Sequence, residues 1–289
     1  MKPAPFDYVA PRTVAEACSI LTDAGGGATV IAGGQTLMPL LNLRMSQPFV
    51  LVDINAIAGF RDVTRVDGGT RVGPGIRQAD ALKNATLSRH VPALVRALGH
   101  VGHHQTRNRG TVGGSVALGE PAAEMPATAV ALGASIEIAS TRGTRTLAAR
   151  DFYIGPYMTA LEPDELVTGI FYPDWGDGHR VVFGEVAQRP GDFALTGVVG
   201  ALALDGAIIT RAGLAWFAMG PTPLAMQQAE AAIAGKALED VDATALADLA
   251  MAGTAPFDDH HASAEYRRTV GRRLFVRTLN GALKQEHAA

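Results

Sequence analysis

Two short glycine-rich stretches constrain this chain more than any other feature of its sequence. An apolar run enters Ala32-Gly33-Gly34-Gln35-Thr36, and Gly110-Thr111-Val112-Gly113-Gly114-Ser115 lies farther along. We call residues 32–36 the first glycine loop and residues 110–115 the second. Because glycine has no Cβ, its backbone N–H can approach a ligand closely, and consecutive N–H groups in a turn form a nest for an anion. Two turns that each join a strand to Gly-Gly and a polar residue therefore predict a site for a pyrophosphate-containing cofactor.

Common nucleotide-binding and serine-nucleophile motifs do not account for these loops. The chain has neither G-x-G-x-x-G after a strand nor G-x-x-x-x-G-K-[ST], which argues against a Rossmann site and a P-loop. Gly114-Ser115 is a near miss to a nucleophile elbow, because Ala117 stands where the second glycine is required. An isolated Gly-Gly is at least as often a plain turn, so the prediction depends on both loops and on their neighbours.

Composition narrows the class of protein. A length of 289 residues suggests two or three domains, and 47% hydrophobic residues are enough for packed cores. The net charge of −3 argues against a nucleic-acid binder. The only cysteine, Cys18, excludes a disulfide framework and an iron–sulfur cluster ligated within this chain. We expect Cys18 to be a small buried apolar residue.

The sequence also predicts where the chain resides. The N-terminus lacks the apolar core of a signal peptide, and no run of 18 apolar residues occurs that would predict a membrane span. We therefore expect a cytoplasmic protein.

The pattern of apolar residues predicts α and β elements in three units. In residues 1–57, Thr13 and Glu16 form a capping box for a helix over 13–24, followed by a strand at 29–31, a helix at 37–43 and a strand at 49–54. In residues 58–175 we expect short strands over 59–71, helices at 78–84, 91–98 and 127–132, and strands at 135–139 and 164–171. Residues 175–179 read as a linker. In residues 176–289 we expect an antiparallel sheet from strands at 180–185, 198–204, 208–210 and 214–217, and helices at 224–234, 243–251 and 262–283.

Three histidines precede the second glycine loop. The spacing of His100, His103 and His104 is compatible with a metal site, but no acidic cluster adjoins them. With Arg96, Arg107 and Arg109 they make a locally basic stretch. We therefore prefer a segment that faces an anion or a partner over a metal site.

The neighbours of both loops resemble a known family, the FAD-binding medium subunit of molybdenum hydroxylases (the xanthine dehydrogenase and aerobic carbon monoxide dehydrogenase family). The resemblance rests first on residues 32–39, on residues 108–115, and on residues 120–126 as the usual continuation. It continues, in order, through residues 42–44, 51–55, 161–166, 191–194 and 263–268. The matching segments thus cover nearly the whole chain.

The resemblance implies an α+β fold with a two-part FAD-binding unit of the PCMH or vanillyl-alcohol oxidase type. Residues 1–57 and 58–175 would be the two FAD-binding subdomains, and residues 176–289 a C-terminal domain of antiparallel sheet plus helices. Phe193 would stack on the isoalloxazine ring. The residues that would bind FAD are Ile31, Ala32, Gly33, Gly34, Gln35, Thr36, Leu37, Val101, Gly102, Gly110, Thr111, Gly114, Ser115, Glu124, Val167, Asp192 and Phe193.

The resemblance also implies a function. The chain would accept electrons from [2Fe-2S] clusters in a small subunit and release them from FAD to an external acceptor. Substrate would be oxidised at a molybdenum cofactor in a large subunit, in a dimer of heterotrimers. We expect neither a catalytic acid–base pair nor a metal ligand in this chain. The substrate stays open between carbon monoxide, an aldehyde and an N-heterocycle.

Two other functions stay open at this point. One is a self-contained flavin oxidase or dehydrogenase that shares the FAD fold, which would turn over substrate when isolated. The other is a scaffold subunit that has lost its flavin, which would show no flavin absorbance.

Overall fold

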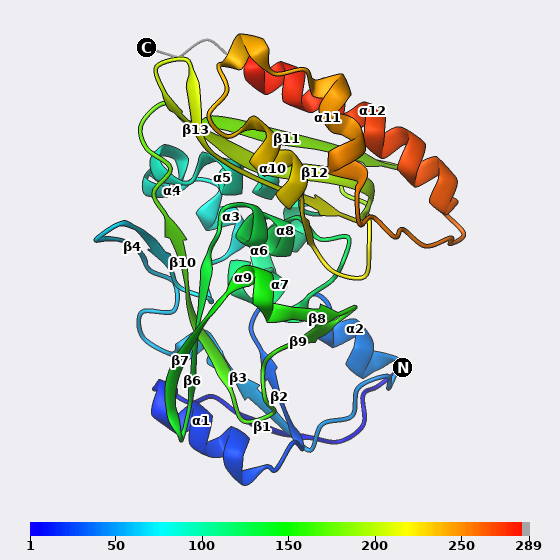
Figure 1. The fold of residues 1–289 in the computed structure, drawn as a ribbon. Helices are drawn as coiled ribbons and strands as arrows, with labels where there is room; N and C mark the ends of the chain where they lie inside the picture. Colours follow the sequence, from blue (N-terminus) through cyan, green and yellow to red (C-terminus); the bar gives the residue numbers. More distant parts are fainter. Residues whose placement is uncertain (285–289) are drawn as a thin grey trace.

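The computed structural model describes residues 1–284 and consists of three parts stacked along the long axis of the molecule (Figure 1). The N-terminal part lies at the bottom of the view, helices and a five-stranded sheet form the middle, and a four-stranded sheet with long helices forms the top. Helices and strands are mixed along the chain, so the predicted α+β class is confirmed.

The N-terminal part is a small parallel sheet with one covering helix. The sheet has the order β1-β3-β2, and Cys18 and Leu21 of α1 are buried as predicted. The capping box forms, because Thr13 Oγ1 accepts from the Glu16 N–H and Glu16 Oε2 accepts from the Thr13 N–H, both at 3.2 Å. Strand β1 was not predicted; three residues are too few for a periodic signal. The elements are β1 (Asp7–Val9), α1 (Val14–Asp23), β2 (Ala28–Ile31), α2 (Leu37–Asn42), β3 (Val50–Asp53) and the 3-10 helix η1 (Ile54–Ala56).

The middle part combines an antiparallel sheet of order β4-β5-β10-β6-β7 with short helices. The predicted helix over 78–84 is shorter, because α3 ends at Ala81 and Asn84 Oδ1 accepts from the Leu87 N–H as the cap of α4. The strands are β4 (Val63–Val66), β5 (Gly69–Val72), β6 (Ser135–Ser140), β7 (Gly143–Ala148), β8 (Tyr153–Gly155), β9 (Met158–Thr159) and β10 (Leu166–Pro173). The helices are α3 (Gln78–Ala81), α4 (Ala85–His90), α5 (Pro92–Leu98), α6 (His104–Arg109), α7 (Val112–Leu118), α8 (Glu124–Ala131) and α9 (Ala149–Phe152).

The C-terminal part is an antiparallel sheet of order β11-β12-β13-β14, with α10, α11 and α12 on one face and α5 and α8 on the other (Figure 1). Helix α12 crosses β11 closely, since a Cβ on Gly184 would lie 2.3 Å from Thr278 Oγ1. The elements are β11 (Arg180–Ala187), β12 (Ala194–Asp205), β13 (Ile208–Phe217), β14 (Leu224–Ala225), α10 (Gln227–Ile233), η2 (Leu238–Asp240), α11 (Ala243–Met251) and α12 (Ala264–Leu283).

The segment between the middle and C-terminal parts is anchored rather than a free linker. Trp175 is 5% exposed, its Nε1 donates to Leu132 O at 3.2 Å, and the Arg211 guanidinium lies 3.8 Å from its ring centroid. The interpretation of residues 175–179 as a linker is therefore wrong for Trp175. Burial of its indole is favourable, because the ring is apolar and its N–H has a hydrogen-bond partner. The domain boundaries at 57/58 and 175/176 stay predictions, and residues 285–289 lie outside the described residues.

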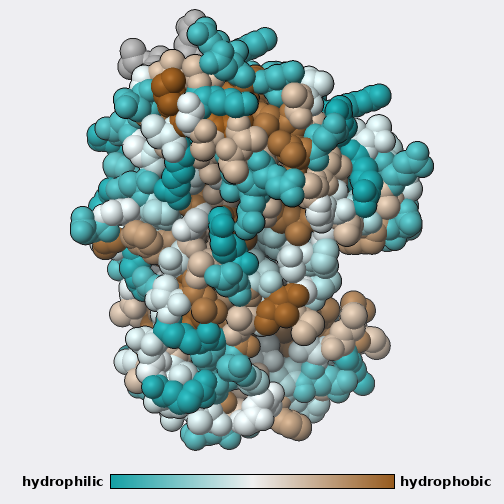
Figure 2. All heavy atoms as spheres, viewed as in Figure 1, coloured by the Kyte–Doolittle hydropathy of each residue, from teal (hydrophilic) through white to brown (hydrophobic). Residues whose placement is uncertain are grey.

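The surface offers no broad apolar belt on the face that Figure 2 shows. Teal hydrophilic residues cover most of it, and brown residues occur in small groups. Among residues 1–284, no helix is long and apolar enough to cross a membrane.

Candidate functional site

One cavity of about 550 Å³ brings the predicted cofactor residues together. Its walls come from all three parts of the molecule, and every residue predicted from the resemblance to bind FAD lines it. Pockets of this size suit small ligands and cofactors. The positions agree with the prediction, whereas direct contact between each residue and FAD stays a prediction.

The first glycine loop presents consecutive N–H groups at this cavity. It leaves β2 and enters α2, with Gly34 in the left-handed region at φ 72°. The N–H groups of residues 33–36 have no acceptor within residues 1–284, and Met38 N donates to Gly34 O at 2.9 Å just beyond them. Such unpaired, consecutive amides form an anion-binding nest. The structure thus supports the nest predicted for the first glycine loop.

Gly33 and Gly34 are required for different structural reasons. A Cβ on Gly33 would lie 2.4 Å from Arg109 O and 2.7 Å from Gly110 Cα, where the two loops meet. A Cβ on Gly34 would meet only the Met38 and Ile31 side chains, at 3.2 and 3.3 Å, and its constraint is the positive φ. Gly33 therefore permits close packing of the loops, and Gly34 permits the turn.

The second glycine loop is a helix start and not the predicted strand-to-glycine turn. It follows α6 and opens α7, with Thr111 as N-cap: Thr111 Oγ1 accepts from the Gly114 N–H at 3.0 Å. Gly113 N donates to Pro74 O at 3.0 Å, and Ser115 N donates to Thr111 O at 3.2 Å. The nest interpretation is wrong for this loop, because its N–H groups bond within the protein. Thr111 lies three residues before Gly114, the spacing that is typical of a helix N-cap. The sequence analysis missed this capping signal.

A polar clamp that was not predicted ties the loops together. Arg77 Nη1 donates to Arg109 O at 2.5 Å, and Arg77 Nη2 donates to Asn55 Oδ1 at 2.7 Å. Asn55 Nδ2 in turn donates to Ala32 O at 2.8 Å. Burial lowers the pKa of the Arg77 guanidinium. Asn55 lies in a segment that carries the family resemblance, but no local pattern indicates Arg77.

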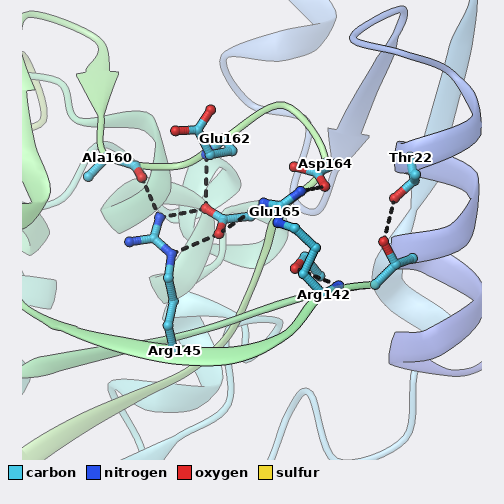
Figure 3. Close-up of polar contacts among 9 residues, drawn as sticks. Thr22, Arg142, Arg145, Ala160, Glu162, Asp164 and Glu165 are labelled. Carbon is cyan, nitrogen blue, oxygen red and sulfur yellow. Dashed lines mark hydrogen bonds and ion pairs between the residues drawn. The ribbon is translucent and has the colours of Figure 1, made fainter.

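A network of ion pairs fixes the wall that leads into β10 (Figure 3). Arg145 holds Glu165 with two bonds, Nε to Oε1 at 2.7 Å and Nη2 to Oε2 at 2.6 Å, and also donates to Ala160 O. Arg142 pairs with Asp164 beside them. The hydrogen bonds from Arg145 hold the pKa of Glu165 below its ordinary value. Because Glu165, Leu166 and Val167 line the cavity, this network positions Val167.

The C-terminal part contributes the segment Gly191–Phe193. Gly191 has φ 90°, and a Cβ there would lie 2.5 Å from His103 Nδ1, so this segment presses against the loop that carries Val101 and Gly102. Asp192 is paired with Arg189 at 3.0 Å. Phe193 lines the cavity and is 65% exposed, so its ring is available to a ligand at the mouth.

Two residues of the basic stretch bond within the protein, and whether the stretch faces an anion or a partner stays a prediction. Arg107 Nη1 donates to both Val101 O and Gly102 O at 2.8 Å and so shapes the cavity wall. His100 faces Glu185 of β11, with Nδ1 3.6 Å from Oε2. Within residues 1–284, no group of His, Cys, Asp and Glu is arranged to hold a metal ion.

The polar residues that line the cavity differ in whether the sequence predicted them. Glu124 was predicted, and burial raises its pKa to about 8, with the charge of Glu185 adding to the effect. Gln78, Thr106 and Glu120 also line the cavity. Glu120 lies in the matching segment 120–126 but was given no role, and Gln78 and Thr106 were missed. They lie in unrelated segments and converge only through the fold.

The residues present fit FAD. The first glycine loop offers unpaired amides for a diphosphate, and aliphatic side chains such as Val30, Leu40 and Leu118 line the cavity for an aromatic ring system. Since hydrogen-bond donors and aliphatic side chains occur in one cavity, the cavity suits a cofactor with an anionic diphosphate and an apolar ring system.

Comparison with known proteins agrees with this fit. Residues 4–175 match the family described as the FAD binding domain in molybdopterin dehydrogenase, and residues 182–282 match the CO dehydrogenase flavoprotein C-terminal domain. The 6-hydroxypseudooxynicotine dehydrogenase complex subunit alpha of Paenarthrobacter nicotinovorans is 36% identical over 98% of this chain and 96% of that protein. The carbon monoxide dehydrogenase medium chain of Hydrogenophaga pseudoflava is 31% identical over 98% of each chain. The structure of reconstituted CO dehydrogenase from Oligotropha carboxidovorans superposes with a TM-score of 0.95 at 31% identity, covering 99% of this chain and 100% of that chain.

Proposed function

Because the chain belongs to the family of FAD-binding domains of molybdopterin dehydrogenases, we propose that it is the FAD-carrying electron-transfer subunit of a molybdenum hydroxylase. The single observation that carries this proposal is the cavity on which the first glycine loop, β10 and residues 191–193 converge. When bound, FAD can accept electrons one at a time and release them in pairs. The chain binds, orients and shields that cofactor.

We assign the parts of the cavity as follows. The N–H groups of residues 33–36, with the side chains of Gln35 and Thr36, bind the diphosphate. Val101, Gly102, Val167 and Phe193 border the flavin ring, with Phe193 covering its face at the mouth. Thr111, Gly114 and Ser115 of the second glycine loop bind the rest of FAD, through the shape of the loop and the hydroxyl groups of Thr111 and Ser115.

The partners follow from the relatives. Those relatives are medium chains or subunits of complexes, so we propose a large subunit with the molybdenum cofactor and a small subunit with iron–sulfur clusters. We further propose two copies of this heterotrimer, a cytoplasmic location and an external electron acceptor. The substrate binds to the large subunit.

The test is reconstitution of the purified chain with FAD, followed by flavin fluorescence. We expect stoichiometric binding and about tenfold weaker binding for Gln35→Ala, since a hydrogen bond to a charged group is removed. Gln227→Ala on the exposed start of α10 is the matched control and should bind FAD like the wild type. A chain that binds no FAD contradicts the proposal. Turnover of an organic substrate by the isolated holoprotein would favour the self-contained oxidase.

A further inference from the structure

Three titratable side chains lie in the region between a surface pocket and the cofactor cavity. At one end, Arg96 and His100 line an open surface pocket beside α4 and α5. His100 Nδ1 lies 3.6 Å from Glu185 Oε2, and its side chain is 46% exposed. At the other end, Glu124 lines the cavity. The three groups come from α8, β11 and the residues after α5.

The Glu185 side chain is buried, and among residues 1–284 one of its two carboxyl oxygens has no hydrogen-bond partner. The side chain is 5% exposed, and this oxygen is Oε2. Strand alternation explains its direction: Gly184 faces Thr278 of α12, so Phe183 and Glu185 face the opposite side, where the Phe183 ring lies 4.6 Å from the His100 ring. An unpaired buried carboxylate is costly, and burial raises the pKa of Glu185 to about 7.

Glu124 is a second buried acid, and it lines the cofactor cavity. It is 6% exposed, and its pKa of about 8 reflects burial and the charge of Glu185, opposed by Arg107. The pKa of His100 is lowered by burial and by Arg96 and Arg107. The positive charge of Arg107 acts on Glu124, and His100 lies beside Glu185. Burial therefore favours the protonated form of both carboxyl groups.

We propose that His100, Glu185 and Glu124 form a proton path from the surface pocket to the cofactor cavity. This inference rests on the proposed function. Electrons that arrive from iron–sulfur clusters bring no protons, so full reduction of FAD by two electrons takes up two protons from solvent. Glu124 gives its proton toward the cavity, Glu185 reprotonates Glu124, and solvent restores Glu185 through His100. Each residue returns to its starting state.

The test measures proton uptake when the FAD-loaded full chain is reduced by dithionite in weakly buffered solution with a pH indicator. We expect Glu124→Gln and Glu185→Gln to slow proton uptake at neutral pH by about a hundredfold. His100→Ala should slow it too, and added imidazole, which can enter the surface pocket, should restore the rate. Glu230→Gln is the matched control, because Glu230 is a largely buried carboxyl with a raised pKa on α10, away from the cavity.

A second readout needs no cofactor. In the infrared spectrum of the FAD-free chain, the carboxyl band that titrates between about pH 6 and 9 should vanish in the Glu124→Gln, Glu185→Gln double variant. Unchanged proton uptake in all three single variants, with FAD bound normally, overturns the path and leaves the proposed function intact. Loss of FAD binding by the wild type overturns the proposed function instead.

Discussion

The two glycine loops have almost the same composition and different architectures. Thr36 and Thr111 each precede a short helix, but only Thr111 Oγ1 caps its helix, through the Gly114 N–H. Among residues 1–284, the N–H groups of residues 33–36 have no acceptor, whereas those of residues 113 and 114 bond to Pro74 O and to the capping Thr111. A Gly-Gly pair therefore indicates that another group comes close to the backbone. The hydrogen bonds of the loop's N–H groups indicate whether that group is a ligand or the protein itself. In the second loop it is the protein, and in the first we propose that it is the ligand.

The largest expected effect comes from Gly33, where the two loops touch. Gly33→Val places a Cβ within 2.4 Å of Arg109 O, and neither backbone can yield cheaply. We expect the free energy of unfolding to fall by about 3 kcal/mol. Thermal denaturation of the variant is compared with that of Gly281→Val, because Gly281 is exposed, has no positive φ and has open space around a Cβ. Equal losses in the two variants contradict the role assigned to Gly33.

Weakening the ion pair of Arg145 and Glu165, at the cavity wall that leads into β10, tests how much this network stabilises the fold. Arg145→Met leaves the carboxylate of Glu165 without its main partner and should cost about 2 kcal/mol, less than a fully buried pair because Arg145 is 38% exposed. The pKa of Glu165 is lowered in the folded protein, so its contribution is present above its ordinary value of 4.5 and is lost as the pH falls through the folded value. Denaturant unfolding should show this acid-side loss in the wild type and a weaker one in the variant.

A matched pair of threonine variants contrasts the loops directly. Thr111→Val removes a cap and should lower the free energy of unfolding by about 1 kcal/mol in the absence of FAD. Thr36→Val removes no cap, so it should leave that stability within about 0.5 kcal/mol and weaken FAD binding instead. Unfolding and FAD titration of both variants check the contrast. Interchanged results would show that the loops have the opposite roles.

The smallest effect on stability is expected at Phe193. Since its side chain is 65% exposed, Phe193→Ala should change the free energy of unfolding by less than about 0.5 kcal/mol. If the ring covers the flavin, the variant should be reoxidised by oxygen at a different rate. Stopped-flow reoxidation measures this, and an unchanged rate argues against the shielding role.

The sequence predicted most of the fold because local signals and family motifs agree. The capping box of Thr13 and Glu16 and the long helix that ends at Leu283 form as expected. Each predicted strand overlaps an observed one, but β1 was not predicted, and the strands predicted at 208–210 and 214–217 form one strand, β13. Features that depend on tertiary contact were not predictable: Arg77 gains its role only where Arg109 O and Asn55 meet it, and Trp175 is anchored by Leu132 and Arg211.

The site shows the same division between local signals and tertiary contacts. The motif residues line one cavity, and their contact with FAD stays a prediction. The second glycine loop was misinterpreted because a helix cap and an anion nest use the same residue types. Gln78 and Glu185 gave no signal, because a buried polar group is informative only once its surroundings are known.

The contrast between the loops can be measured by amide hydrogen exchange with and without FAD, resolved by residue in NMR. We predict that FAD slows exchange strongly at residues 33–36 and changes it little at residues 113–115, whose N–H groups already have partners. Strong FAD-dependent protection at residues 113–115, with none at residues 33–36, would contradict the account.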